Sequence, residues 1–218
     1  AKLGILGETG AGKSTLVNLI SRFYDPTEGH VLIDGVDARD WPLATLRSQV
    51  CVVAQDTFLF SDTIGGNISF GAGEQREYDE QYIRRMATIA GADGFIRSMP
   101  EGYDTIVGER GVGLSGGQKQ RISLARALAI RPSILILDDT TSAVDMETEK
   151  QIQHSLKELD FPCTKVIIAQ RISTTRDADR IIVLRDGYIE ESGTHEELLA
   201  KKGYYYELVK LQTGLDEL

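Results

Sequence analysis

Short apolar runs alternate with segments of helical periodicity along most of the chain. Runs of this length, bounded by turn residues or charges, are typical of buried strands, and they cover residues 3–6, 30–35, 50–54, 134–139, 166–169 and 181–184. After the first run, four apolar residues share the spacing of one helical face: Leu16, Leu19, Ile20 and Phe23. Strands that alternate with helices predict an α/β fold, in which helices cover the faces of a parallel sheet.

Three further segments are predicted to be helical. Residues 43–48 form a short helical stretch, and Ile152, Leu156 and Leu159 mark a longer helix between two of the strands. Residues 196–211 form a C-terminal helical stretch, with the three tyrosines at 204–206 at a turn. We interpret these tyrosines as packing residues rather than as ligands.

Residues 71–129 differ from the rest of the chain. They are mostly helical and polar, and their only strand-like run is the brief 105–107. We therefore predict one domain over residues 1–218, in which a helical lobe, 71–129, is inserted into an α/β core formed by 1–70 and 130–218.

Composition narrows the class of protein. The chain has 218 residues, of which 41% are hydrophobic and 26% charged, as in ordinary globular domains. Its net charge of −9 argues against nucleic acid as a partner, and no apolar run reaches the roughly 18 residues of a membrane span. Cys51 and Cys163 lie beside apolar runs, which favours buried thiols in a reducing compartment. Because residue 2 already begins a strand, we expect the chain to be a piece of something longer.

The first strand leads into a phosphate-binding P-loop pattern, G-x-x-x-x-G-K-[ST]. It comprises Gly7, Glu8, Thr9, Gly10, Ala11, Gly12, Lys13, Ser14 and Thr15. The glycines let successive N–H groups point into one hollow, at a helix N-terminus that favours anions. Lys13 is expected to reach the β- and γ-phosphates, and the Ser14 hydroxyl to bind Mg²⁺.

Two other strands end in candidate ligands. Asp138 and Asp139 close the run at 134–139. The first is expected to hold Mg²⁺ and the second to lie near the γ-phosphate. Gln55 follows the run at 50–54, where the carboxyl ends of strands face a ligand crevice. It can contact Mg²⁺ or the attacking water; a solvated loop glutamine is the equal alternative.

The segment Leu114–Gln118 starts a second helix that can receive an anion. Ser115 can cap this helix, and Gly116 and Gly117 permit close backbone approach. A plain Ser-Gly-Gly N-cap without any ligand is the alternative interpretation.

With five motifs in order, the chain resembles the nucleotide-binding domain of ABC transporters over nearly its whole length. The P-loop corresponds to Walker A, Gln55 to the Q-loop and 114–118 to the LSGGQ signature. Residues 137–138 close Walker B, and 142–145, ending in Asp145, are similar to the D-loop. Residues 59–64 and 107–111 are similar to stretches of exporter-type domains, the latter to a loop that touches membrane helices.

The resemblance implies a RecA-like P-loop NTPase core whose N-terminal antiparallel β part is largely missing here. It also implies ATP and Mg²⁺ as cofactors, with Asp145 near the nucleotide. Head-to-tail dimers would hold ATP between one Walker A and the partner's signature, so Ser115, Gly116, Gly117 and Gln118 would act in trans. The implied partners are a second nucleotide-binding domain and a transmembrane domain, at the cytoplasmic face of a membrane.

Two site positions depart from the family pattern. The family's catalytic Glu is Asp139 here, and its switch His is Gln170. Asp is one methylene shorter, and Gln can donate a hydrogen bond but cannot shuttle a proton. These changes predict a site that binds ATP and hydrolyses it slowly, in one half of a heterodimeric exporter. Alternatively, Asp139 still serves as the base and Gln170 is neutral.

The family's adenine-stacking aromatic lies upstream of this chain's first residue.

A regulatory or scaffold module, in which ATP is only a clamp without productive hydrolysis, is the second functional hypothesis. A soluble ABC ATPase of DNA repair or translation is a third, but the coiled-coil insertion or basic face that it requires is not found in the sequence.

Overall fold

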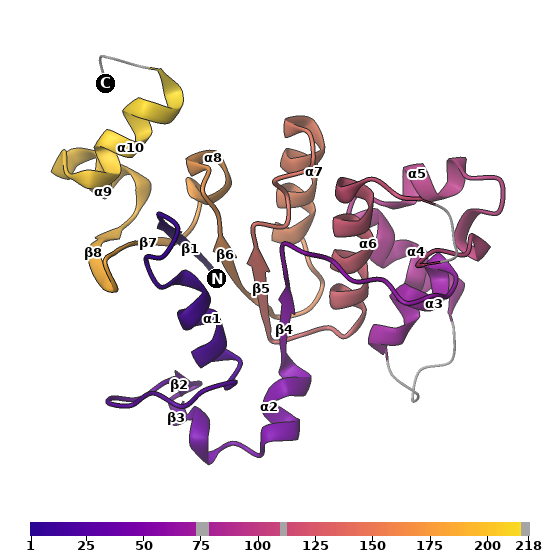
Figure 1. The fold of residues 1–218 in the computed structure, drawn as a ribbon, viewed down its shortest axis with the longest axis horizontal. Helices are drawn as coiled ribbons and strands as arrows, with labels where there is room; N and C mark the ends of the chain where they lie inside the picture. The colour runs from indigo at the N-terminus through magenta and orange to yellow at the C-terminus, as the bar shows by residue number, and fades with distance from the viewer. Residues whose placement is uncertain (73–78, 110–112, 215–218) are drawn as a thin grey trace. The chain divides into compact units, whose positions relative to one another are not determined.

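The computed structural model (Figure 1) describes residues 1–72, 79–109 and 113–214. The chain divides into two compact units. The first comprises residues 1–51, 134–139 and 164–218, and the second comprises 52–133 and 140–163. One boundary falls inside strand β4 (Val50–Val53), two flank strand β5 (Ile134–Asp138), before Ile134 and after Asp139, and the fourth falls directly before Thr164.

A six-stranded sheet organises the first unit. Its order is β4-β5-β6-β1-β7-β8, where the remaining strands are β6 (Thr164–Ile168), β1 (Lys2–Gly7), β7 (Arg180–Arg185) and β8 (Tyr188–Gly193). Strand β1 pairs in parallel with both β6 and β7, and β5 pairs in parallel with β6. Strand β8 pairs antiparallel with β7. The predicted α/β class with a mostly parallel sheet is confirmed.

The helices of the first unit were predicted except for the short helix at 172–175, and two of the predictions need correction. They are α1 (Lys13–Ile20), α2 (Leu43–Gln49), α8 (Ile172–Thr175), α9 (His195–Lys201) and α10 (Tyr204–Thr213), together with the short 3-10 turn Ala38–Asp40. The helix after the P-loop stops at Ile20, so Phe23 lies beyond it and is 62% exposed. The helical stretch predicted over 196–211, with a turn at the tyrosines, consists of two helices, and the turn falls just before the tyrosines, where Lys202 takes a left-handed conformation and Gly203 follows it.

Smaller elements also differ from prediction. The run at 30–35 forms a strand of only two residues, β2 (Leu32–Ile33), which pairs with β3 (Val36–Asp37) in a separate hairpin. Strand β8 was not predicted, because its residues 188–193 lack an apolar run; half of them are exposed. Both cysteines are half-buried rather than fully buried.

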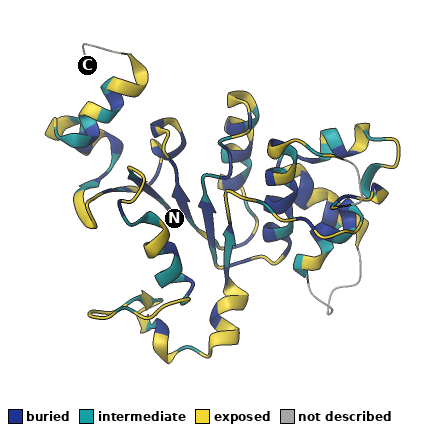
Figure 2. Ribbon diagram, in the orientation of Figure 1, coloured by how far each residue is buried: buried dark blue, intermediate teal, exposed yellow. Residues whose placement is uncertain are grey.

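Helices dominate the second unit. They are α3 (Ile64–Ser69), the 3-10 turn Phe70–Ala72, α4 (Glu80–Ile89), α5 (Asp93–Ser98), the 3-10 turn Gly102–Asp104, α6 (Gly116–Ala129) and α7 (Met146–Lys157). Helix α6 packs against α3 and α4, and Ile122, Ala125 and Leu128 are fully buried. Figure 2 shows most of α6 coloured as buried. The strand-like run at 105–107 contributes only an isolated bridge between Thr63 and Ile106.

Candidate functional site

The P-loop leaves strand β1 at Gly7 and becomes helix α1 at Lys13. Gly10 and Gly12 take positive φ angles of 84° and 108°, which residues with a Cβ rarely adopt. No side chain caps α1, so its first N–H groups are left for an anion. Glu8, Thr9, Gly10, Ser14 and Thr15 are exposed to solvent. The loop therefore has the open backbone cradle that phosphate binding requires.

Lys13 lies inside this loop. Its ammonium group donates to the carbonyl oxygen of Gly7 and, at 3.4 Å, to that of Glu8. Burial lowers the pKa of Lys13, and the nearby negative charges of Asp138 and Asp139 oppose that shift. The two predicted carboxylates therefore lie close enough to the P-loop lysine to interact with it electrostatically.

Strand β5 and the residue directly after it provide both carboxylates. Asp138, its last residue, pairs in register with Ile168 and is half-buried. Burial raises the pKa of Asp138, against the attraction of the Lys13 charge. Asp139 takes a left-handed φ of 50°, and its N–H donates to the Ile168 oxygen at 2.8 Å. The backbone thus turns sharply at Asp139, directly after the strand.

The donor set suits Mg²⁺ held together with nucleotide phosphates. Among the described residues, no group of three or more His, Cys, Asp or Glu side chains could hold a metal alone. Mg²⁺ commonly takes only one or two protein oxygens and completes its octahedron with phosphate and water. The Ser14 hydroxyl and the Asp138 carboxylate are oxygen ligands of that kind.

Gln170 and the P-loop line one hollow in the first unit. This cavity of about 440 Å³ is bordered by Leu6, Gly7, Glu8, Thr9, Gln170, Tyr204, Leu208 and Gln212. Gln170 is exposed, and its backbone carbonyl oxygen accepts a hydrogen bond from Gln212 Nε2 at 2.7 Å. Tyr204 donates its hydroxyl proton to Glu8 Oε1 at 2.9 Å. Sequence reasoning treated this tyrosine as packing and missed the contact.

The predicted signature begins helix α6 in the second unit. Ser115 Oγ accepts from the Gln118 N–H at 3.2 Å, and Gln118 Oε1 accepts from the Ser115 N–H at 3.0 Å. This reciprocal capping box satisfies two groups at the helix start. Gly117 is buried, and a Cβ built there would lie 2.7 Å from the Ala143 oxygen. The signature therefore packs directly against the predicted D-loop at 142–145.

The other predicted residues of the second unit are Asp145 and Gln55. Asp145 caps α7 and accepts from the N–H of Thr148 at 2.9 Å and from its hydroxyl at 2.7 Å. These bonds hold the pKa of Asp145 below its usual value. Gln55 is exposed in a bend after β4, and its carbonyl oxygen faces Gln120 Nε2 at 3.5 Å.

The two exporter-like stretches lie against each other. The Val107 N–H donates to the Asp62 oxygen and the Ile64 N–H to the Thr105 oxygen, both at 2.9 Å. Gly108, with a φ of 100°, approaches Ser61 so closely that a Cβ would lie 2.7 Å from the Ser61 Cα. Residues 110–111, the end of the predicted loop 107–111, lie outside the described residues.

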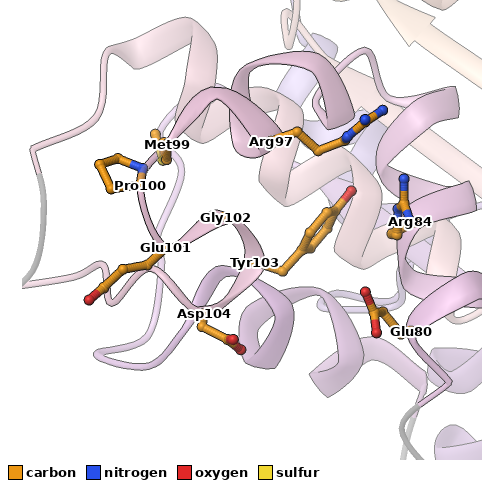
Figure 3. A pocket seen from close by; sticks show the side chains of 9 residues that line it. All are labelled: Glu80, Arg84, Arg97, Met99, Pro100, Glu101, Gly102, Tyr103 and Asp104. Atoms are coloured by element: carbon orange, nitrogen blue, oxygen red, sulfur yellow. The ribbon is translucent and has the colours of Figure 1, made fainter.

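A second hollow of about 490 Å³ in this unit is lined by none of the predicted site residues (Figure 3). Arg84 and Arg97 border it and lie 3.8 and 3.7 Å from the Asp93 carboxylate. The Tyr103 hydroxyl, which also borders it, donates to Asp93 at 2.7 Å. Both arginines thus pair with Asp93, and acidic side chains, Glu80, Glu101 and Asp104, also border the hollow.

Fold and site together define a P-loop nucleotide-binding protein, and comparisons with known proteins narrow this class. Residues 1–142 match the sequence profile described as ABC transporter. The chain is 50% identical over 212 residues to the ATP-dependent lipid A-core flippase of Salmonella typhimurium. It is 52% identical over 210 residues to YknU of Bacillus subtilis, an uncharacterized ABC transporter ATP-binding protein. The matches cover 97% and 96% of this chain but only 36% and 35% of those relatives.

A solved structure gives the same result. A bacterial Atm1-family ABC exporter with ATP bound superposes with a TM-score of 0.91 at 42% identity, over 97% of this chain and 37% of that one. The chain therefore belongs to the ABC transporter family. It is similar to the ATP-binding domains of exporters, which lie at the cytoplasmic face of a membrane. Within the part of the chain that the structure describes, no helix is both long and apolar enough to cross a membrane.

Proposed function

We propose that this chain binds Mg-ATP and closes on a second nucleotide-binding domain, and that this closure powers transport through membrane helices of the same exporter. The observation that carries the proposal is the electrostatic interaction of Lys13, inside the P-loop, with the carboxylates of Asp138 and Asp139 at the end of β5. This arrangement pairs an anion cradle with carboxylates for a cation, as phosphoryl chemistry requires. The capping box at Ser115 fixes the start of α6, and this helix N-terminus, with Gly116 and Gly117, is our candidate for a second phosphate contact, made in trans to the partner's nucleotide.

Each residue of the site then has a definite task. The N–H groups of 7–15 and Lys13 bind the phosphates, and Lys13 exchanges its contacts with loop carbonyls for contacts with nucleotide. Ser14, Gln55 and Asp138 hold Mg²⁺, which neutralises phosphate charge when bound. Ser115, Gly116, Gly117 and Gln118 contact the partner's nucleotide, and Asp145 lies at the same junction.

We further propose that this site hydrolyses ATP slowly and that the partner domain is not identical. A general base must lie within roughly 2.6–3.2 Å of the proton it removes, directly or through one water. The Asp139 carboxylate is one methylene shorter than Glu, and a misplacement of about 1 Å can cost about 10²-fold in rate. Gln170, at the edge of the hollow beside the P-loop, can donate a hydrogen bond but cannot carry a proton.

The test is ATP binding and single-turnover hydrolysis, by this chain alone and mixed with a candidate partner domain. We expect tight binding in both cases and hydrolysis only in the mixture. Asp139→Glu should raise turnover at this site, in a complex whose partner site is disabled, by up to about 10²-fold. Asp139→Asn is the matched control, because it keeps the size of the side chain and removes the base.

Three results would contradict parts of this proposal. Failure of the chain and of the complex to bind ATP would refute nucleotide binding itself. Equal turnover by the unaltered protein and the Asp139→Glu variant would show that Asp is an adequate base and that the site is not impaired. A closed dimer that never separates, in any complex, would favour the regulatory or scaffold module, in which ATP is only a clamp, over a domain that drives transport.

A further inference from the structure

Helix α10 contacts both sides of the hollow beside the P-loop. At its first residue, Tyr204 donates to Glu8 Oε1 at 2.9 Å. Near its end, Gln212 donates from Nε2 to the Gln170 oxygen at 2.7 Å. Gln212 Oε1 also accepts from the Ile172 N–H at 2.8 Å. These two side chains lie eight residues apart, about 12 Å along a helix, so one rigid element spans the distance from phosphate loop to residue 170.

The helix is fixed by a separate, apolar face. Tyr205 and Val209 are buried one turn apart, in a cluster with Leu198 of α9 and Val183 of β7. The Tyr205 N–H also donates to the Glu191 carboxylate at 2.6 Å. Because this face anchors α10 to the sheet, the neighbouring row at Tyr204, Leu208 and Gln212 is held over the hollow that all three line.

Two further contacts hold the tyrosine end in place. The Arg185 guanidinium lies over the Tyr204 ring, 4.8 Å from its centre. Two residues on, in the turn between β7 and β8, the Gly187 N–H donates to the Ala11 oxygen at 3.2 Å. Helix α10 and the turn between β7 and β8 therefore reach the P-loop at two separate points, Glu8 and Ala11.

We propose that Tyr204 and Gln212 are positioning residues for nucleotide binding and turnover. Tyr204 fixes the P-loop through Glu8, and Gln212 fixes the chain at Gln170 and Ile172. Helix α10 thus sets the distance between the P-loop and Gln170, the residue that we expect near the γ-phosphate. This inference rests on the proposed ATP-binding function.

The experiment compares Tyr204→Phe and Gln212→Met in the complete protein that carries this domain. Affinities for Mg-ATP and Mg-ADP and single-turnover rates are measured for each. Tyr204→Phe keeps the ring and removes the bond to Glu8, so both nucleotides should bind about three- to tenfold more weakly, the effect of one hydrogen bond. Gln212→Met should weaken ATP binding or slow turnover by a similar factor and leave ADP affinity unchanged.

Gln212→Glu separates the two bonds that the Gln212 amide makes. Its carboxylate can still accept from the Ile172 N–H but cannot donate to the Gln170 oxygen, so we expect the same loss specific to ATP. Tyr206→Phe is the matched control. Its ring lies 5.6 Å from Lys210 on the same helix and does not line the hollow, and both affinities should stay at the wild-type value.

The outcomes separate this inference from the proposed function. If the unaltered protein binds no ATP, the proposed function fails. If it binds ATP and the Tyr204 and Gln212 variants match it, the positioning roles are wrong. Equal losses of ATP and ADP affinity in both variants, with a lowered melting temperature, would mean that α10 only stabilises the fold.

Discussion

The contact between helix α6, which begins at the signature, and the D-loop predicts how much a Cβ at Gly117 would destabilise the fold. Gly116 and Gly117 are neighbours at the start of α6, and alanine at either position gains the same helix propensity, at most about 1 kcal/mol. A Cβ on Gly116 would meet the Ala143 Cβ at an ordinary 3.8 Å. A Cβ on Gly117 would lie 2.7 Å from the Ala143 oxygen, where ordinary contact begins at 3.4 Å.

Gly117→Ala must therefore push the helix start and the backbone at Ala143 apart by about 0.7 Å. Overpacking of this kind typically costs about 1–3 kcal/mol. Since the propensity gain is common to both variants, the difference between Gly117→Ala and Gly116→Ala isolates this cost. For a chain of this size, each kcal/mol moves the melting temperature by about 2–4 °C. We expect Gly117→Ala to melt about 2–12 °C below Gly116→Ala.

Thermal unfolding followed by circular dichroism, with urea unfolding as a second measure, tests this difference on the same chain without nucleotide. Unfolding of both variants at one temperature would refute the reasoning, as would a higher stability of Gly117→Ala. Either result would mean that the segment at 142–145 moves freely against α6. The D-loop would then not be held in register with the signature.

Three other predictions follow from single side chains. Ser115→Ala should lose about 1 kcal/mol of stability with its cap, whereas Ser115→Asp keeps the cap and the melting temperature; both should impair the partner's ATP site, as measured by nucleotide-driven dimerisation. Because burial raises the pKa of Asp138, Mg²⁺-dependent ATP binding should weaken on acidification at a pH above the ordinary Asp value of about 3.9, and Asp138→Asn should abolish that pH dependence in a binding titration. Asn67 is fully buried and makes three hydrogen bonds to the backbone of Phe60 and Thr63, so Asn67→Ala should cost about 2–4 kcal/mol in urea unfolding; an unchanged midpoint would show that water replaces the amide.

The sequence pattern was sufficient to predict those elements that depend only on neighbouring residues. The strand that ends at Asp138 follows from an apolar run, and the cap at Ser115 follows from a Ser directly before a helical spacing of apolar residues. Both depend on residues within a few positions of each other, and the structure shows strand and cap where they were expected. Whether these residues bind nucleotide remains a prediction.

Contacts between distant residues could not be predicted in this way. Tyr204 and Glu8 are 196 positions apart. From the sequence alone, three consecutive tyrosines indicate packing, because only the fold brings Tyr204 next to the P-loop. The turn between α9 and α10 had a local signal, Gly203, and the sequence analysis placed it slightly too late, at the tyrosines that begin α10. Phe23 continued a helical spacing past the point where Arg22, with a φ of 53°, ends the helix.

The place of β1 in the sheet has a consequence for how ligand binding can be observed. Its backbone amides bond to partners on both sides, β6 and β7, while the loop that follows it is exposed at Glu8, Thr9 and Gly10. Amide hydrogens of such a central strand exchange with solvent only on large-scale opening, whereas those of an exposed loop exchange quickly. Deuterium uptake should therefore change from slow to fast within a few residues at Gly7. Nucleotide protection of residues 8–12 would stand out against that background, which makes a peptide spanning this junction a sensitive reporter of occupancy.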